Sequence, residues 1–225
     1  GTNLFITGGN TLYWRVRLQA SGVGPNRQMA IYKEKLADPV KNSAETTVRW
    51  RHSPKSNPES KISGTLYNNW HDVCNEEPND WVVSDPYWWG YNNTGVAAGT
   101  RIPGLVGREV DQLMTKFPIP KNTRIVAHGS YVCGSTGVPV TKLHDATFIT
   151  LKSGASVFAA GSQMWPCAMN GNCVGQGTTD LTNRFTRAVT DNVIQVFDAG
   201  KVKKSWRAKN NVKTVYGKTK FKYIK

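Results

Sequence analysis

Two segments of the sequence place polar residues directly after short apolar runs. In the first, two glycines flank a Leu-Val step and lead to Glu109. In the second, the apolar run 155–160 is followed by a glycine and then by Ser162 and Gln163. The carboxyl ends of buried strands are where α/β proteins hold their chemistry. A carboxylate there can ligate a hard metal ion or act as a general base, although Glu109 could equally pair with one of the many cations of the chain.

The amino-terminal segment has a similar organisation. Residues 3–7 form a compact apolar run that ends at Gly8 and Gly9, and a strand followed by a tight turn presents the next residue above the sheet. That residue is Asn10 or Thr11, and neither is a ready nucleophile. We take Asn10 and Glu109 as candidate catalytic residues. Tyr13 follows shortly, and composition alone favours an interior aromatic side chain whose hydroxyl group is hydrogen-bonded.

Several motifs of known enzyme classes are absent from the sequence. There is no Gly-x-Ser-x-Gly turn, no Gly-x-x-x-x-Gly-Lys-Ser/Thr loop, no Gly-x-Gly-x-x-Gly fingerprint and no His-Glu-x-x-His pair. Serine hydrolases, nucleotide hydrolases and zinc proteases therefore lose their support. A catalytic cysteine stays open, because Cys133 follows an apolar run and His128 or His144 could approach it. A disulfide or a buried thiol is the favoured interpretation of Cys133.

The four cysteines are expected to form at least one disulfide. Cys167 and Cys173 enclose an Asn-Gly turn signal and could close a small loop, which leaves Cys74 and Cys133 as a second pair. Disulfides indicate an oxidising compartment, so we expect a secreted or otherwise extracytoplasmic protein. Four unpaired thiols are the alternative. No window of 18 or more apolar residues occurs, so no transmembrane segment is expected.

An aromatic cluster is a candidate ligand-binding surface. It consists of Tyr87, Trp88, Trp89 and Tyr91, which are surrounded by Asn and Gly residues. Such a cluster could form a stacking platform for sugars or bases, or it could plug one end of a sheet. The sequence leaves both interpretations open.

The net charge of +14 is concentrated near the carboxyl terminus. Residues 200–225 hold nine lysines and one arginine without a single acid, whereas the preceding 199 residues carry only +4. One interpretation of this basic tail is an exposed β-rich segment, an edge strand or edge hairpin whose lysines discourage further pairing. The other is a binding site for a polyanion or a glycan, in which Lys203, Lys204 and Arg207 would take part.

Hydrophobic periodicity predicts several strands and one convincing helix. The expected strands cover residues 3–7, 28–32, 81–84, 123–132, 146–151 and 156–160. A hairpin-type turn is expected at 152–154. A helix is expected over 180–197, because apolar side chains recur at three and four positions and Thr and Gly residues flank the segment. We therefore expect an α/β domain over residues 1–199 and the basic tail over 200–225.

A series of short stretches follows one another in a specific order. They are 8–17 (Gly-Gly-Asn-Thr-Leu-Tyr-Trp-Arg-Val-Arg), Tyr32-Lys33 with Asp38-Pro39, 46–51 (Thr-Thr-Val-Arg-Trp-Arg), 58–60 with 63–64, 101–111, and 157–165 with the following helix. This series resembles the carboxyl-terminal domain of the N,N-dimethylformamidase large (beta) subunit family and spans most of residues 3–197. The segment 166–173 departs from the usual run of the family, and the basic tail lies outside the resemblance.

The resemblance implies a three-layer α/β fold similar to class I glutamine amidotransferases. In the family, further strands and a ligating tyrosine precede the Gly-Gly-Asn segment, so the sheet would be incomplete in this chain. A second chain or an amino-terminal fragment would then complete it. For true dimethylformamidases the resemblance also implies a mononuclear Fe(III) site, built from two tyrosinates and one glutamate, at which water attacks an amide carbonyl. By motif position, Tyr13 would be one tyrosinate and Glu109 the carboxylate ligand.

Two functions follow from these expectations. The first is metal-dependent hydrolysis of a C–N amide bond by a dimethylformamidase-like domain. The alternative is a non-catalytic extracellular binding or structural protein, which would recognise a polyanion or a glycan through the basic tail and the aromatic cluster. A homo-oligomer is compatible with both.

Overall fold

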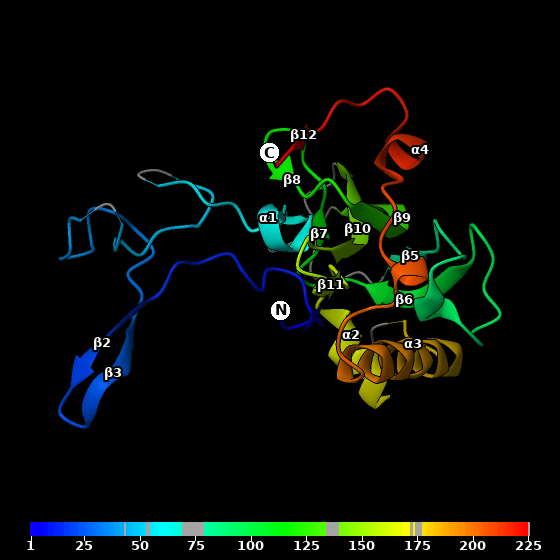
Figure 1. Cartoon of the computed structure of the whole chain (residues 1–225), viewed down its shortest axis with the longest axis horizontal. Coiled ribbons are helices and arrows are strands. Elements are labelled where there is room, and N and C mark those ends of the chain that lie inside the picture. The colour runs from blue at the N-terminus through cyan, green and yellow to red at the C-terminus, as the bar shows by residue number, and fades with distance from the viewer. Residues whose placement is uncertain are drawn as a thin grey trace.

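The computed structural model describes residues 1–42, 44–52, 55–68, 79–133, 140–171, 173 and 177–224 of the 225-residue chain, and of residue 133 only the backbone. Figure 1 shows a body, in which most helices and strands are packed together, and a long arm that projects from one side of it. We call residues 14–57 the arm and the remaining residues the body. Nearly all of the hydrophobic core lies in the body.

The main sheet of the body has four strands in the order β1-β11-β10-β9. They are β1 (Leu4–Ile6), β9 (Thr123–Cys133), β10 (Val140–Thr150) and β11 (Ser156–Ala159). β1 runs parallel to β11, and the other neighbours are antiparallel. The predicted turn at 152–154 reverses the chain, so that Thr150 pairs with Ser156. All four residues of β11 are buried, which accounts for its continuous apolar run.

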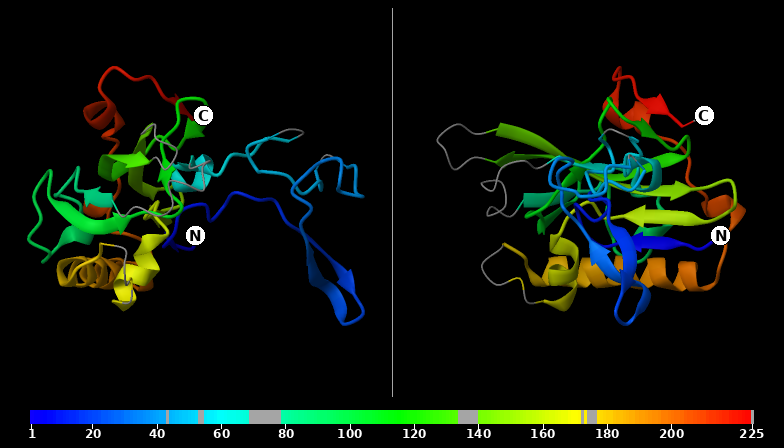
Figure 2. Two further views of the ribbon diagram at one scale, coloured as in Figure 1. Left: turned by 180° about the vertical axis from the view of Figure 1, so that it is seen from behind. Right: turned by 90° about the vertical axis from the view of Figure 1, so that its left-hand side faces the viewer.

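The predicted helix is α3 (Asp180–Asp198), one residue longer than expected. A capping box between Thr179 and Thr182 closes its first turn, so two backbone N–H groups of the helix end find partners. Figure 2 shows α3 running beneath the main sheet, and α2 (Met164–Asn170) packs against it. The buried side chains of α3 recur at three- and four-residue spacing. They are Thr182, Phe185, Thr186, Val189, Thr190 and Val193.

Short sheets and helical turns complete the body. β4 pairs with β7 and β5 with β6 in antiparallel fashion, whereas β8 and β12 run parallel. Their bounds are β4 (Leu66–Tyr67), β5 (Asn79–Val82), β6 (Arg101–Val106), β7 (Asp111–Gln112), β8 (Pro118–Ile119) and β12 (Lys222–Tyr223). The helical turns are α1 (Ser60–Ser63), η2 (Trp89–Tyr91), η3 (Lys204–Trp206) and α4 (Val212–Tyr216). Within the described residues, no helix is long and apolar enough to cross a membrane.

The fold is mixed α/β, as predicted, with several small sheets and few helices. Only one of the three strand pairs in the main sheet is parallel, because a tight turn rather than a helical crossover joins β10 to β11. A three-layer sheet of the class I glutamine amidotransferase type therefore stays a prediction.

The basic tail differs from the expected β-rich segment or edge hairpin. Within residues 200–224 it forms η3 and α4, and its two-residue strand β12 pairs in parallel with β8. Val202, Ala208 and Val212 are buried against the body. Asn211 also fixes the tail, because its Oδ1 accepts a hydrogen bond of 2.7 Å from the Ile125 backbone N–H. The tail is packed on the body, since apolar side chains between its lysines find places in the core.

The arm consists of one hairpin and a long loop. The hairpin pairs β2 (Arg17–Ser21) with β3 (Gly24–Ala30), and Leu18 faces Met29 across it. The expected strand at 28–32 thus begins and ends earlier than predicted. The loop folds around the buried carboxylate of Asp38, which pairs with Arg17 at 3.1 Å and accepts a hydrogen bond of 2.7 Å from the Thr47 backbone N–H. Polar contacts rather than apolar packing organise the arm.

Candidate functional site

The predicted polar residues meet at one edge of the main sheet. Because β1 and β11 are parallel neighbours, the turn after β1 and the segment after β11 lie side by side. The loop between β6 and β7 joins them, since Val110 forms a bridge with Ser162. Gly9 allows the closest approach, because a Cβ atom at this position would lie 2.2 Å from the carbonyl oxygen of Glu109. A side chain at position 9 would therefore push the Glu109 loop away.

Both carboxylate oxygens of Glu109 accept hydrogen bonds from amide side chains. Asn10 Nδ2 donates to Oε1 at 2.7 Å, and Gln163 Nε2 donates to Oε2 at 3.3 Å. The backbone N–H of Gln163 also donates to the Glu109 carbonyl oxygen at 3.0 Å. Asn10 adopts a positive φ of 57°, a conformation that Asn tolerates better than most residues. Asn10 and Glu109, the candidate catalytic pair, are therefore in direct contact.

Asp111 is a second carboxyl group at this site. It is buried, and its Oδ1 accepts a hydrogen bond of 2.9 Å from the backbone N–H of Asn10. The pKa of Asp111 is raised to about 7, chiefly by burial and also by the nearby carboxylates of Glu59 and Glu109, whereas the Asn10 N–H and Arg51 lower it. The sequence analysis assigned Asp111 no role of its own. Its position two residues after Glu109 could have indicated that it belongs to the site.

Tyr13 lies at the root of the arm, among rings and cations. It is buried, its ring meets that of Tyr67 edge-on at 5.3 Å, and the guanidinium groups of Arg51 and Arg49 lie 4.8 and 5.1 Å from its ring centre. Burial raises the pKa of Tyr13, while Arg49 and Arg51 lower it and Glu59 raises it. The net shift of this pKa is upward, so burial favours the neutral phenol and the two arginines only moderate that effect.

A buried ion pair connects Tyr13 to the carboxyl groups. Arg51 pairs with Glu59, and its Nη1 donates to the carbonyl oxygen of Tyr67 at 2.8 Å. Tyr67 pairs with Asp111 in the β4–β7 ladder. Among the residues that the structure describes, no hydrogen bond or ion pair joins Tyr13 directly to Glu109. Tyr13 is thus connected to the carboxyl groups of this neighbourhood only through Arg51 and Tyr67, which, like Glu59, were not foreseen from the sequence.

The donor atoms of this neighbourhood fit a hard metal ion. They are carboxylate, amide and phenol oxygens, the ligand types that such ions prefer. In addition, Asn10 Oδ1 is buried and has no hydrogen-bond partner, which is an unusual state for a polar atom. Over the described ranges, no three His, Cys, Asp or Glu side chains converge as metal ligands. A metal ion here would need a tyrosine or amide oxygen in its coordination sphere.

The other candidate ligand-binding residues belong to the aromatic cluster and the basic tail. Trp88, Trp89 and Tyr91 are buried in the core, and only Tyr87 is exposed, at 90%. Three of the four rings therefore cannot stack on a ligand from solvent, and they fill the interior as the plug interpretation expected. In the tail, Lys203 and Lys204 are exposed and Arg207 is half-buried. Lys203 lies 4.9 Å from the ring centre of Trp206. Binding of a polyanion or glycan by these cations stays a prediction.

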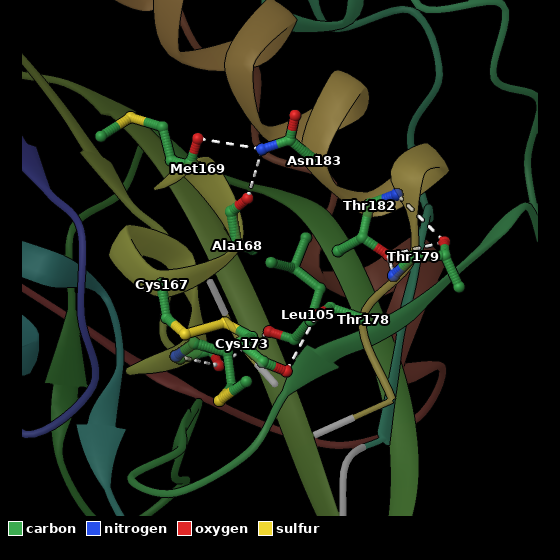
Figure 3. Close-up of a disulfide and its surroundings, with 11 residues drawn as sticks. Leu105, Cys167, Ala168, Met169, Cys173, Thr178, Thr179, Thr182 and Asn183 are labelled. Atoms are coloured by element: carbon green, nitrogen blue, oxygen red, sulfur yellow. Dashed lines mark hydrogen bonds between the residues drawn. A yellow bond between two sulfur atoms is a disulfide. The ribbon is translucent and has the colours of Figure 1, made fainter. Parts of the chain in front are cut away.

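The predicted disulfide between Cys167 and Cys173 is present, and Figure 3 shows it at the end of α2. Asn183 of α3 holds the same end of α2 by donating from Nδ2 to the carbonyl oxygens of Ala168, at 2.8 Å, and Met169, at 3.0 Å. The disulfide thus closes the segment that follows Gln163. The second expected pair, Cys74 with Cys133, falls outside the described residues and side chains.

Comparison with known proteins identifies the family. A family model described as "N,N-dimethylformamidase beta subunit-like, C-terminal" matches residues 1–180. The chain therefore belongs to the N,N-dimethylformamidase beta subunit-like family, as the ordered series of stretches predicted. The match includes Asn10, Tyr13 and Glu109 and ends at the start of α3. No curated protein matches the chain.

Proposed function

We propose that this member of the N,N-dimethylformamidase beta subunit-like family hydrolyses a C–N amide bond at the site around Glu109. One observation carries the proposal: the Glu109 carboxylate is held from both sides by Asn10 and Gln163, at the ends of two parallel neighbouring strands. A carboxylate fixed in this way is preorganised to ligate a metal ion or to orient a water molecule. The family membership supports an amide as the substrate class.

Fe(III) is the metal ion that we propose for this site. Glu109 and Tyr13 would hold it, because hard anionic oxygens suit a ferric ion and the positive charge of the ion would favour loss of the phenol proton that burial otherwise retains. The bound ion would supply Lewis acidity toward the amide carbonyl oxygen. The unpaired Oδ1 of Asn10 is a further oxygen available at the same place.

The residues of the chain would handle the protons of the hydrolysis. Water adds its oxygen to the carbonyl carbon, the C–N bond breaks, and the leaving nitrogen takes up a proton. Asp111 is suited to proton transfer near neutrality, because its pKa of about 7 leaves both of its protonation states populated there. Asn10 and Gln163 would keep the Glu109 carboxylate in one orientation while the reaction proceeds.

We also propose an extracytoplasmic location and a second chain or fragment as a partner. The Cys167–Cys173 disulfide supports an extracytoplasmic location, since such bonds persist in oxidising compartments. β1 stands at the end of the strand order in the main sheet, so its outer edge is a place where a strand from a second chain or fragment could add.

Amide hydrolysis by the purified, iron-loaded protein tests the proposal. Amine release is measured from a panel of small amides that includes N,N-dimethylformamide. Glu109→Gln is expected to lower kcat/KM about 100-fold, and Asn10→Ala or Gln163→Ala about 10-fold, because ligands and their hydrogen-bond partners contribute on this scale. Glu45→Gln, at an exposed position on the arm, is the matched control and should retain full activity. Hydrolysis that survives Glu109→Gln would refute the proposal.

A further inference from the structure

The arm carries a cavity of about 490 Å³. This volume falls within the range of small-molecule binding sites, about 300–1,000 Å³. Its apolar walls are the half-buried ring of Trp14 and the buried side chain of Val48. The other lining residues are polar, and they are Lys33, Glu34, Lys35, Arg49 and His52. A cavity with apolar walls and a few charged groups can orient a ligand by its charge.

Two segments of the arm pair with each other and hold the walls of this cavity together. Trp14 forms an antiparallel bridge with Arg49. The backbone N–H of Arg15 donates to the carbonyl oxygen of Val48 at 2.9 Å. Side chains of directly opposed residues in such a pair lie on the same face. The Trp14 ring and the Arg49 side chain therefore stand next to each other on one side of the cavity.

Lys33 is fixed against the same wall. The backbone N–H of Tyr32 donates to Thr47 Oγ1 at 2.9 Å, which ties the chain before Lys33 to the segment that carries Arg49. Lys33 adopts a positive φ of 68°, a conformation that residues with a side chain rarely adopt. Its ammonium nitrogen lies 5.7 Å from the ring centre of Trp14, and the guanidinium carbon of Arg49 lies 5.3 Å from it. One indole ring thus positions two cations at the cavity.

The lining of the cavity has a surplus of positive charge. Lys33, Lys35 and Arg49 supply three cations and Glu34 supplies one acid, which gives a net charge of +2 with His52 neutral. Within the described parts of the chain, no ion pair holds Lys33 or Lys35. These two ammonium groups are therefore available to a negatively charged ligand.

His52 reports the electrostatic surroundings of the cavity. Burial lowers the pKa of His52, and the positive charges of Arg49, Arg51 and Lys116 lower it further. Of these three cations, Arg51 is paired with Glu59. A lowered pKa of this origin means that positive charge outweighs negative charge around the imidazole ring.

The other two acids of the arm do not line the cavity. Asp38 is buried and pairs with Arg17 at 3.1 Å. Glu45 is exposed, and its Oε1 accepts a hydrogen bond of 3.2 Å from Asn42 Nδ2. Glu34 is therefore the one acid of the arm that a ligand in the cavity would meet.

We propose that this cavity binds the acidic group, a carboxylate or a phosphate, of a small-molecule ligand. Lys and Arg side chains are the usual partners of both groups, while Trp14 and Val48 offer apolar contact to the rest of the ligand. Arg49 also lies 5.1 Å from the ring centre of Tyr13, so the bound anion lies near the proposed metal ligand. Binding at this cavity requires neither the metal ion nor the hydrolytic activity proposed above.

Calorimetric titration of the full chain at neutral pH tests this binding. The probes are succinate and inorganic phosphate, and uncharged succinamide is the matched control for succinate. We expect one molecule of at least one anion to bind per chain and succinamide not to bind. Succinate binding without phosphate binding identifies a carboxylate ligand, and the reverse identifies a phosphate ligand.

Charge variants locate the bound anion. Lys33→Gln and Lys35→Gln should each raise the dissociation constant about 3- to 5-fold, because an ion pair at an exposed site contributes modestly. Glu34→Gln should lower the dissociation constant by a similar factor, since it removes a repelling acid. Arg27→Gln, on the hairpin and outside the cavity lining, removes one positive charge from the arm as a control and should leave the affinity unchanged. All four residues are exposed, so each variant should keep the wild-type thermal midpoint.

Three results would overturn the proposal. The first is the absence of saturable binding of either anion up to about 10 mM. The second is binding of succinamide as tight as that of succinate. The third is an equal loss of affinity in Arg27→Gln and Lys33→Gln, which would mean that the overall charge of the arm, rather than this cavity, attracts the anion.

Discussion

The body and the arm are stabilised by different kinds of contact. The body buries large aromatic side chains completely, among them Trp81, Trp88 and Trp165. The arm contributes no side chain to the hydrophobic clusters formed by the described residues. Its most buried groups are instead charged or polar, such as Asp38 and Arg15. Apolar packing thus stabilises the body, whereas buried polar and charged groups organise the arm.

The candidate site lies where these two regions meet. Glu109 and Asp111 belong to the body, Tyr13 directly precedes the arm, and Arg51 belongs to the arm. Apolar burial fixes strand β6 before the Glu109 loop, whereas a buried ion pair between Arg51 and Glu59 lies in the environment of Tyr13. The environments of the two proposed metal ligands are therefore stabilised by different kinds of contact.

Trp165→Ala should produce the largest loss of stability. Trp165 is fully buried, contacts the rings of Phe5, Trp81 and Phe158, and donates from its indole N–H to Thr190 Oγ1 at 3.0 Å. We expect a loss of about 3–5 kcal/mol in the free energy of unfolding, measured by denaturant titration.

Leu36→Ala is the matched substitution in the arm, where the side chain is 90% exposed. It should change the free energy of unfolding by less than about 0.5 kcal/mol. Equal losses at both positions would contradict the difference drawn between body and arm.

Asp111→Asn should change the pH dependence of stability. The pKa of Asp111 is about 7 in the folded protein against 3.8 as the ordinary value, so the folded state binds the proton more tightly. The stability due to this group is complete below pH 4 and is lost as the pH rises through 7. Relative to Asp111→Asn, the wild type should therefore lose a few kcal/mol between pH 4 and pH 7, because one pKa unit corresponds to about 1.4 kcal/mol.

Thermal unfolding of both proteins at a series of pH values measures this effect. Other titrating groups, such as His144, are common to both proteins and cancel in the difference. Parallel stability curves for wild type and variant would show that Asp111 titrates normally and would remove it from the proposed proton transfer.

Loss of the Cys167–Cys173 disulfide should have a smaller effect on the body. The loop that it closes has a sequence separation of only six residues, so the chain-entropy estimate is about 2 kcal/mol. The double Cys→Ser variant, compared with wild type by denaturant titration, checks this value. A loss of the size expected for Trp165→Ala would mean that the disulfide, rather than the aromatic core, holds the helices on the sheet.

Asp38→Asn should have the smallest effect on global unfolding and a large local one. Burial alone would raise the pKa of Asp38, but hydrogen bonds from Thr47, Val40 and Arg17 hold it well below its usual range. The variant loses the negative charge that accepts these hydrogen bonds, so the arm should be cut faster by protease. The thermal midpoint of the body should stay unchanged. Asp198→Asn, at an exposed helix end, is the control. A lowered midpoint for Asp38→Asn would show that body and arm unfold together.

Much of the body could be predicted from the sequence, because its elements have strong local patterns. β11 is a continuous apolar run, and α3 has both its buried stripe and its cap residues. Asn10 and Glu109 could each be proposed as candidates because each follows an apolar run, but their contact could not be predicted, since β6 before Glu109 pairs with β5 outside the main sheet.

The rest depends on contacts between distant segments. Tyr67 enters the site only because β4 pairs with β7, and no local pattern encodes that pairing. Composition showed an aromatic cluster but could not tell the exposed Tyr87 from the buried Trp88 beside it. The projection of the arm was not foreseen either, because Leu18 and Met29 look like core residues in the sequence although both face solvent.

Iron content together with the visible spectrum tests the central claim most directly. The purified chain, with any co-purifying partner retained, is incubated with Fe(III) and freed of excess metal. We predict near-stoichiometric iron with a tyrosinate-to-iron charge-transfer band, loss of the band in Tyr13→Phe, loss of iron in Glu109→Gln, and no change in the exposed control Tyr87→Phe. A colourless protein without iron, or a Glu109→Gln variant that binds iron as well as wild type, would contradict the account.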